Sequence, residues 1–136
     1  MPLQIVGLKQ RNHAGWALLL LLTVVLACSS GSGKKCTATL TYKGKTYTGG
    51  DTGANRSKEK ATSNACNKYC RDDDPDYDVM YRIWADSPAG RAAGRPSKEE
   101  AIFKDARLLD YVTITCANKC VGWTKDGSAK VETKCD

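Results

Sequence analysis

Histidine, phenylalanine and methionine are scarce in this chain, and acidic residues are missing from its first fifty positions. The 136 residues include one histidine, His13, one phenylalanine and two methionines, and no aspartate or glutamate precedes Asp51. Catalytic triads, cysteine–histidine pairs and histidine-ligated zinc sites all need a histidine in the working domain. If the segment that carries His13 is removed, the mature protein cannot perform any of these chemistries.

A run long enough to cross a membrane is also missing. The apolar run at 16–27 has twelve residues, whereas a helix that crosses ~30 Å of hydrocarbon needs roughly 20. Lys9 and Arg11 give the run a positive flank, and the polar stretch 29–33 follows it closely. This arrangement is typical of an export signal rather than of a permanent transmembrane helix.

The end of the apolar run carries a short motif. Val25-Leu26-Ala27-Cys28 resembles the lipobox of bacterial lipoprotein precursors, in which a small residue precedes a cysteine. The resemblance implies that residues 1–27 are a removed signal peptide, that Cys28 becomes an N-terminus acylated with a lipid such as palmitate, and that 28–35 form a flexible tether. It places the protein in the bacterial cell envelope, with the lipid bilayer as one partner. Ser29, in place of an aspartate after Cys28, favours the outer membrane where the cell has one; the alternative is ordinary cleavage at the same place and secretion without lipid.

Cysteine parity supports lipidation. The chain has seven cysteines, and acylation of Cys28 leaves six in an exported domain, which predicts three disulfides. Six cysteines allow about 15 connectivities, and the sequence leaves the choice open. Cys66 and Cys70 lie four residues apart on a predicted helix, so we expect them to bridge to different partners. The six are Cys36, Cys66, Cys70, Cys116, Cys120 and Cys135.

The mature chain has the size of one small domain. Removal of residues 1–27 leaves 109 of the 136 residues, of which 36–136 are predicted to form a single globular, disulfide-rich domain. Hydrophobic patterns predict an α+β fold, approximately ββαα followed by three short strands. The predicted elements are strands at 36–42 and 45–48, helices at 57–70 and 97–109, and strands at 111–116, 121–124 and 129–133.

Local signals define the ends of these elements. Lys43-Gly44 is a hairpin turn, and Ser57 is the predicted N-cap of the first helix. Ser97 and Glu100 form a capping box for the second helix, and Asp126-Gly127 is the predicted turn of a last hairpin. Two connecting segments, the acidic stretch 72–78 around Pro75 and the stretch 86–96, are predicted to be irregular.

Residues 38–70 carry a second resemblance. The Lys43-Gly44-Lys45 turn, the glycine-rich loop and the helix start at Ser57-Lys58 are similar to the second half of a double-stranded RNA-binding domain. In that family, lysines at the start of the final helix face phosphates across a groove. Lys58 matches the first of those positions, whereas Glu59 and Thr62 stand at the next two. The resemblance therefore implies a similar ββα shape rather than the same function.

A basic segment is a candidate binding site. Residues 34–71 carry nine basic and two acidic side chains, which suits an anionic polymer or lipid headgroups. The candidate residues are Lys43, Lys45, Lys58 and Lys60. The alternative is a solvated surface that the neighbouring aspartates balance.

Those aspartates are a second candidate. Asp72, Asp74, Asp76 and Asp78 alternate along the chain, so an extended backbone would place four carboxylates on one side, a ligand set that suits calcium. An exposed acidic turn without a metal is the favoured interpretation.

Together these patterns predict a membrane-anchored bacterial lipoprotein with a non-catalytic binding or scaffolding domain. Paired cysteines leave no free thiol for catalysis, so we expect no enzyme activity, no cofactor and no small-molecule substrate. The expected partner, besides the bilayer, is an envelope protein or an anionic polymer. The alternative function is a secreted or anchored basic module that binds nucleic acid or polysaccharide through the ββα unit.

Overall fold

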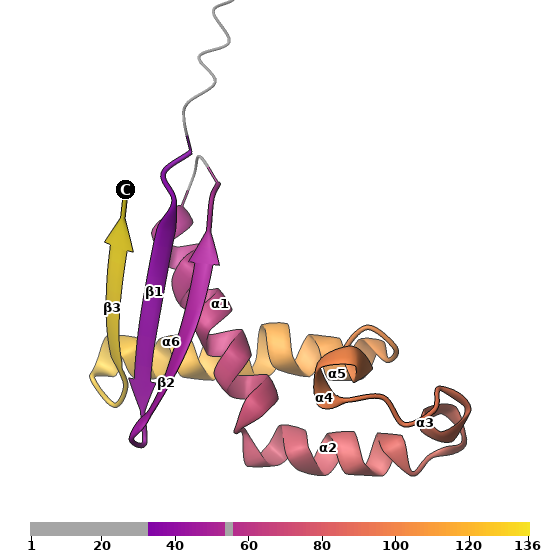
Figure 1. Cartoon of the computed structure of the whole chain (residues 1–136). Coiled ribbons are helices and arrows are strands. Elements are labelled where there is room, and N and C mark those ends of the chain that lie inside the picture. Colours follow the sequence, from indigo (N-terminus) through magenta and orange to yellow (C-terminus); the bar gives the residue numbers. More distant parts are fainter. Residues whose placement is uncertain (1–32, 54–55) are drawn as a thin grey trace, which may run out of the picture.

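The computed structural model describes residues 33–53 and 56–136 (Figure 1). A three-stranded sheet and one long helix stand upright, and the last helix runs across their lower part (Figure 1). The helices between these two extend to one side as a helical arm. This confirms a mixed α+β fold. The elements are β1 (Cys36–Tyr42), β2 (Lys45–Asp51), α1 (Ser57–Asp72), α2 (Pro75–Ala85), α3 (Pro88–Ala92), α4 (Lys98–Ala101), α5 (Ala106–Asp110), the π-helical segment η1 (Tyr111–Cys116), α6 (Ala117–Asp126) and β3 (Lys130–Cys135).

The sheet is antiparallel throughout, with strand order β2-β1-β3. The predicted hairpin turn is confirmed: Lys43 and Gly44 have φ values of 49° and 76°, which match the twist that a two-residue hairpin needs. In β1, Ala38 and Leu40 are fully buried, whereas Thr37 and Thr39 are partly exposed. This period of two places α1 on one face of the sheet and solvent on the other.

Helix α1 covers the inner face of the sheet. Its buried stripe includes Ala61, Ala65 and Tyr69, as the sequence predicts. The predicted N-cap is wrong: Arg56 occupies that position with a φ of 58°, and the Ser57 hydroxyl donates to the carbonyl of Gly53 instead. The chain enters the helix through a left-handed residue, so the Ser57 side chain points back along the preceding loop.

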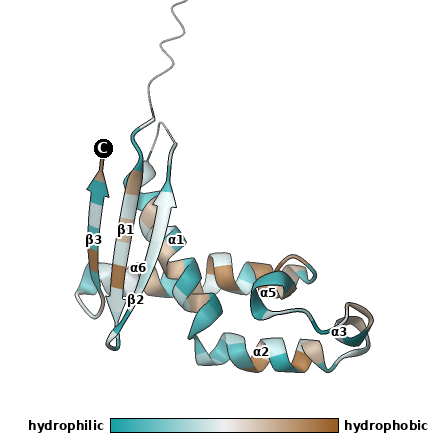
Figure 2. Cartoon of the chain, viewed as in Figure 1, coloured by the Kyte–Doolittle hydropathy of each residue, from teal (hydrophilic) through white to brown (hydrophobic). Residues whose placement is uncertain are grey.

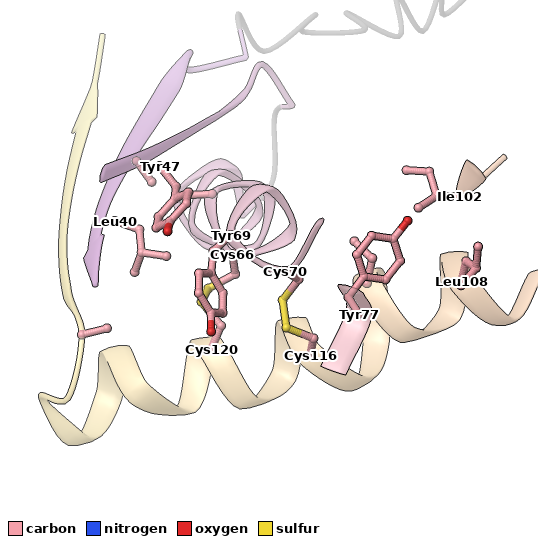
Figure 3. Close-up of a cluster of buried hydrophobic side chains, with 14 of the residues drawn as sticks. Leu40, Tyr47, Cys66, Tyr69, Cys70, Tyr77, Ile102, Leu108, Cys116 and Cys120 are labelled. Carbon is pink, nitrogen blue, oxygen red and sulfur yellow. A yellow bond between two sulfur atoms is a disulfide. The ribbon is translucent and has the colours of Figure 1, made fainter. Parts of the chain in front are cut away.

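Three disulfides link the elements, which confirms the predicted count. Cys36 is bonded to Cys135 across β1 and β3, while two parallel bridges join α1 to the helical segment at 111–126. Figure 3 shows these two bridges, Cys66–Cys120 and Cys70–Cys116, between α1 and the helix below it. Cys66 and Cys70 therefore do bond to different partners, as expected from their helical spacing.

The prediction that the stretches 72–78 and 86–96 are irregular was wrong, because a helix begins in each of them. Asp74 is the N-cap of α2, with Pro75 in the first turn, and its carboxylate accepts from the Tyr77 N–H at 2.9 Å. Ser87 and Pro88 start α3 in the same way, inside the predicted loop 86–96. Proline fits the first turn of a helix because its missing N–H has no partner there. An Asp-Pro or Ser-Pro pair thus begins a helix here.

The predicted second helix is interrupted. The capping box of Ser97 and Glu100 is present, but α4 ends at Ala101. A new helix, α5, starts after Asp105, whose side chain accepts from the Arg107 N–H. The break turns Phe103 outward, where it is 75% exposed.

Two predicted strands are helical. The alternation at 111–116 also places Val112 and Cys116 four residues apart, and both are buried on one side of η1, so the pattern fits a helix equally well. Residues 121–124 belong to α6, which ends at Gly127 with a φ of 85°, the left-handed position that favours glycine. The predicted last hairpin is therefore wrong, and β3 pairs with β1 instead.

Candidate functional site

A cleft lies between β2, α1 and the segment from Ile102 to Thr113. It has a volume of about 460 Å³, within the usual range for ligand sites of about 300–1,000 Å³. One wall is Thr48–Gly50 of β2, α1 lies along the cleft, and the opposite wall comes from Ile102 to Thr113. We call it the β2 cleft. Its lining residues are Thr48, Gly49, Gly50, Asn64, Asn67, Lys68, Arg71, Ile102, Phe103, Leu109, Val112 and Thr113.

Strand β2 contributes a free sheet edge to this cleft. Because a two-residue turn closes the hairpin, Tyr42 and Lys45 form a hydrogen-bonded pair, and such pairs then recur at every second residue. The backbone groups of Thr46, Thr48 and Gly50 therefore point away from β1. The Asn64 amide donates to the Gly50 carbonyl at 2.7 Å, which agrees with this register and covers that end of the edge.

The opposite wall is apolar and partly exposed. Ile102 and Val112 are buried, whereas Phe103 leaves 75% of its surface in solvent. The charged lining residues are Lys68 and Arg71, both basic. Arg71 lies 2.8 Å from Asp72 and 3.1 Å from Glu99, and within the described ranges Lys68 has no ion pair. The cleft thus combines an apolar surface with one cation, Lys68, that no carboxylate of the described residues pairs with.

Asn67 adds a polar feature to the α1 side of the cleft. Its Oδ1 atom is buried and accepts no hydrogen bond from any residue that the structure describes. A buried acceptor without a donor costs about 1–3 kcal/mol. This acceptor lies beneath the α1 side of the cleft, enclosed by the protein.

The lower end of β2 is fixed to the end of α1. The Tyr47 hydroxyl donates to Asp73 at 2.8 Å, and the Lys45 ammonium pairs with the same carboxylate. The Lys45 and Tyr47 hydrogen bonds hold the pKa of Asp73 below its usual value. Burial, reinforced by the bond to Asp73, raises the pKa of Tyr47. The strand is therefore fixed to α1 at the end where its outer edge is open.

The structure does not bring the predicted lipidation and anionic-ligand residues together at one site. Cys28, the predicted lipidation site, lies outside the described residues. Lys43 lies in the hairpin turn and Lys45 directly follows it. Both are close to Tyr69 and Pro75, near the end of α1. Lys58 and Lys60 lie in its first turn, and a 16-residue helix is about 24 Å long. The four lysines thus belong to opposite ends of the domain (Figure 1).

The four aspartates of the predicted cation site do not share one side of an extended chain, because α2 begins at Pro75. Asp74 caps this helix and accepts from Tyr111 at 3.0 Å. Asp78 pairs with Lys98 at 2.6 Å, and Asp72 pairs with Arg71. Within residues 33–53 and 56–136, no group of three or more histidine, cysteine or acidic side chains is placed to hold a metal ion. The extended arrangement is therefore wrong.

Comparison with known proteins gives no relative. No protein-family model matches the chain, and neither a curated protein nor a solved structure matches it significantly. The described part contains β1, β2 and α1 in the ββα order of the predicted unit, while the two family resemblances remain predictions. In the same part, no helix has both the length and the apolar character needed to cross a membrane.

The β2 cleft has a mixed polar and apolar lining. Its lining contains amides, hydroxyls, two cations and apolar side chains, which form hydrogen bonds and contacts. Neither the cleft nor the exposure of Phe103 was predicted from the sequence. One signal was available: Thr46 to Gly50 carries no charge between Lys45 and Asp51, which is unusual for an edge strand.

Proposed function

We propose that the protein is a lipid-anchored, non-catalytic binding protein of the bacterial cell envelope, and that the β2 cleft is its binding site. The observation that carries the proposal is the cysteine pairing. All six cysteines from Cys36 to Cys135 are used within the folded part. Only Cys28, in the lipobox-like motif, is left for another purpose.

The position of the tether supports this proposal. Lys35 accepts a backbone hydrogen bond from Asp136 at 3.0 Å, beside the Cys36–Cys135 bridge. The chain therefore leaves the folded part at the free end of the sheet. Ser29 to Lys35 span at most ~25 Å when fully extended, which would hold the domain close to the membrane. Gly50, which pairs with Thr37 at this end of the sheet, also lines the β2 cleft, so the cleft begins near the point of attachment.

The lack of a histidine or a free thiol in the folded part supports a function without catalysis. The only histidine is His13, within the predicted signal peptide, and the six disulfide-bonded cysteines have no thiol to react. Binding in the β2 cleft would use backbone groups, amides and apolar contacts.

Mass spectrometry of the full-length product tests the anchor. The protein is expressed in bacteria, extracted from membranes with detergent and measured intact before and after reduction. We expect a mature N-terminus at Cys28 with added acyl mass, and a gain of about 6 Da on reduction of three disulfides. The matched variant C28S should lose the acyl mass and leave the membrane fraction. An unmodified Cys28 or a retained Met1 would contradict the proposal.

A basic hollow beside the tether supports the alternative function. Lys34, Arg56 and Lys58 line a hollow of about 340 Å³ next to Cys36 and Cys135, and within the described residues none of the three forms an ion pair. Retention of the protein on heparin at moderate salt, weakened by K58Q and unchanged by K43Q, would favour an anionic-polymer module. Loss of retention with both variants alike would point to net charge alone.

A further inference from the structure

We propose that the β2 cleft binds an extended peptide segment of a partner protein, which adds to the outer edge of β2 as a fourth strand. This inference rests on the proposed binding function and names the chemistry of its partner. The structure offers both parts of such a site, a row of backbone groups for the strand and an apolar wall for its side chains.

The first argument is the free edge. Thr46 and Thr48 direct an N–H and a C=O each away from β1, and both residues are exposed. An antiparallel strand would pair with each threonine through two hydrogen bonds. Neither small molecules nor polysaccharides carry donors and acceptors at this spacing, whereas every peptide backbone does.

The second argument compares the two edges of the sheet. β3, the other edge, carries Lys130, Glu132 and Lys134 on alternate positions, a charge pattern that prevents strand addition. Strand β2 has only threonine, tyrosine and glycine between Lys45 and Asp51. Figure 2 shows this difference as pale colours along β2 and teal at the arrowhead of β3. The open edge is thus confined to β2, next to the cleft.

The third argument is the surface beside that edge. A strand alternates its side chains, so every second residue of the added segment would face the same side as Tyr47 and Gly49, toward α1 and the cleft. There it would meet the exposed ring of Phe103 and the ammonium of Lys68. A segment whose cleft-facing residues include both apolar and acidic side chains, with neutral residues between them, fits these contacts best.

The test uses the full-length, detergent-purified protein and four capped heptapeptides that have threonine at every second position. The positions between the threonines carry valine and glutamate, phenylalanine and glutamate, valine and lysine, or valine alone. Binding is followed by NMR titration of the backbone amides. We expect the glutamate peptides to bind most tightly and to protect the Thr46 and Thr48 amides from hydrogen exchange. A glutamate peptide with N-methyl groups on alternate residues has lost one row of donors, and it should bind about tenfold more weakly.

Two substitutions of Thr48 distinguish the contribution of its backbone N–H to binding from that of its side chain. T48P removes an outward N–H at a position where an edge strand tolerates proline, and it should weaken binding about tenfold. T48V removes only the hydroxyl and should change the affinity less than threefold. F103A should weaken binding of the phenylalanine peptide more than that of the valine–threonine peptide.

Three outcomes would overturn the inference. The first is that no peptide binds, and the second is that a peptide binds without protecting the Thr46 and Thr48 amides. The third is that self-association alone protects these amides, which would assign the edge to a second copy of the chain. The wild-type exchange measurement decides the matter even if T48P does not fold. Acylation of Cys28 is measured separately, so failure of the peptide site and failure of the anchor can be told apart.

Discussion

Gly49 in β2 lies against the backbone of Ala65 in α1, without room for a side chain between them. A Cβ atom at Gly49 would lie 2.1 Å from the Ala65 nitrogen and 2.6 Å from the Ala61 carbonyl oxygen. Real Cβ atoms do not approach backbone atoms so closely, so one element would have to move. This contact sets the distance between β2 and α1, two of the elements that line the β2 cleft.

The substitution G49A is expected to destabilise the protein by about 2 kcal/mol or more, because a methyl group would push α1 off the sheet. Urea denaturation of the oxidised protein measures the change. The neighbouring substitution G50A is the matched control. Its Cβ would meet only the Cys36 carbonyl, at 3.7 Å, so we expect a change within about 0.5 kcal/mol. Equal losses for the two variants would mean that β2 and α1 are not in close contact.

The two bridges between α1 and the 111–126 segment should make separate contributions. Cys70 and Cys116 close a loop with a sequence separation of 46. The double variant C70A/C116A should therefore lose roughly 2–4 kcal/mol of stability while keeping the other two bonds. Peptide mapping of the unreduced wild type must join Cys66 to Cys120 and Cys70 to Cys116. A map that joins Cys66 to Cys116 would contradict the parallel arrangement of the two bridges.

The cysteine spacing shows how far the sequence could predict this fold. Cys66–Cys70 and Cys116–Cys120 are both spaced by four residues, and two helices with that spacing can be joined twice. The helical spacing was recognised for the first pair only. At 111–116 the alternation of β-branched residues favoured a strand, because Val112 and Cys116 satisfy both periods. The pairing with a partner helix, which decides between the two periods, is a tertiary feature and is absent from a local pattern.

The candidate site was less predictable than the fold. The β2 cleft brings together Gly50, Asn67 and Phe103, which are far apart in the sequence. Phe103 is exposed only because the chain turns between α4 and α5, and a continuous helical pattern over 97–109 hides that turn. The charge-free edge of β2, in contrast, is visible in the sequence once the strand is known to lie at the edge of the sheet.

Asp74 is expected to be the most important of the clustered aspartates. It is 7% exposed, caps α2 and accepts from the Tyr111 hydroxyl. Removing both hydrogen bonds in D74A should cost about 1–3 kcal/mol. It should also lower the pKa of Tyr111, which burial and the bond to Asp74 now raise. Ultraviolet titration of the tyrosines and thermal unfolding give the two measurements.

The control for this prediction is D76A. Asp76 is exposed and lies 3.4 Å from the Tyr111 hydroxyl, so its loss should change the stability by less than about 0.5 kcal/mol. A larger effect for D76A than for D74A would show that the run acts through its total charge.

The contact of Asp73 with Tyr47 and Lys45 predicts how stability depends on pH. The pKa of Asp73 is lowered by its hydrogen bonds to Lys45 and Tyr47, so its contribution is present above the ordinary aspartate pKa of about 3.9. That contribution is lost as the pH falls through the lower pKa of the folded state. The pKa of Tyr47 is raised, so its contribution is complete below pH ~10 and is lost at higher pH.

The variants D73N and Y47F measure the low-pH loss due to Asp73 and the high-pH loss due to Tyr47 separately. At pH 6 to 8 each should unfold at a lower urea concentration than the wild type, with a loss of about 0.5–1.5 kcal/mol for the missing hydrogen bond. The deficit of D73N should shrink as the pH is lowered toward 3, because the wild-type carboxylate is then protonated. The deficit of Y47F should stay constant up to pH ~10 and shrink above it. A D73N deficit that is independent of pH would mean that Asp73 holds β2 by packing, without a contribution from its charge.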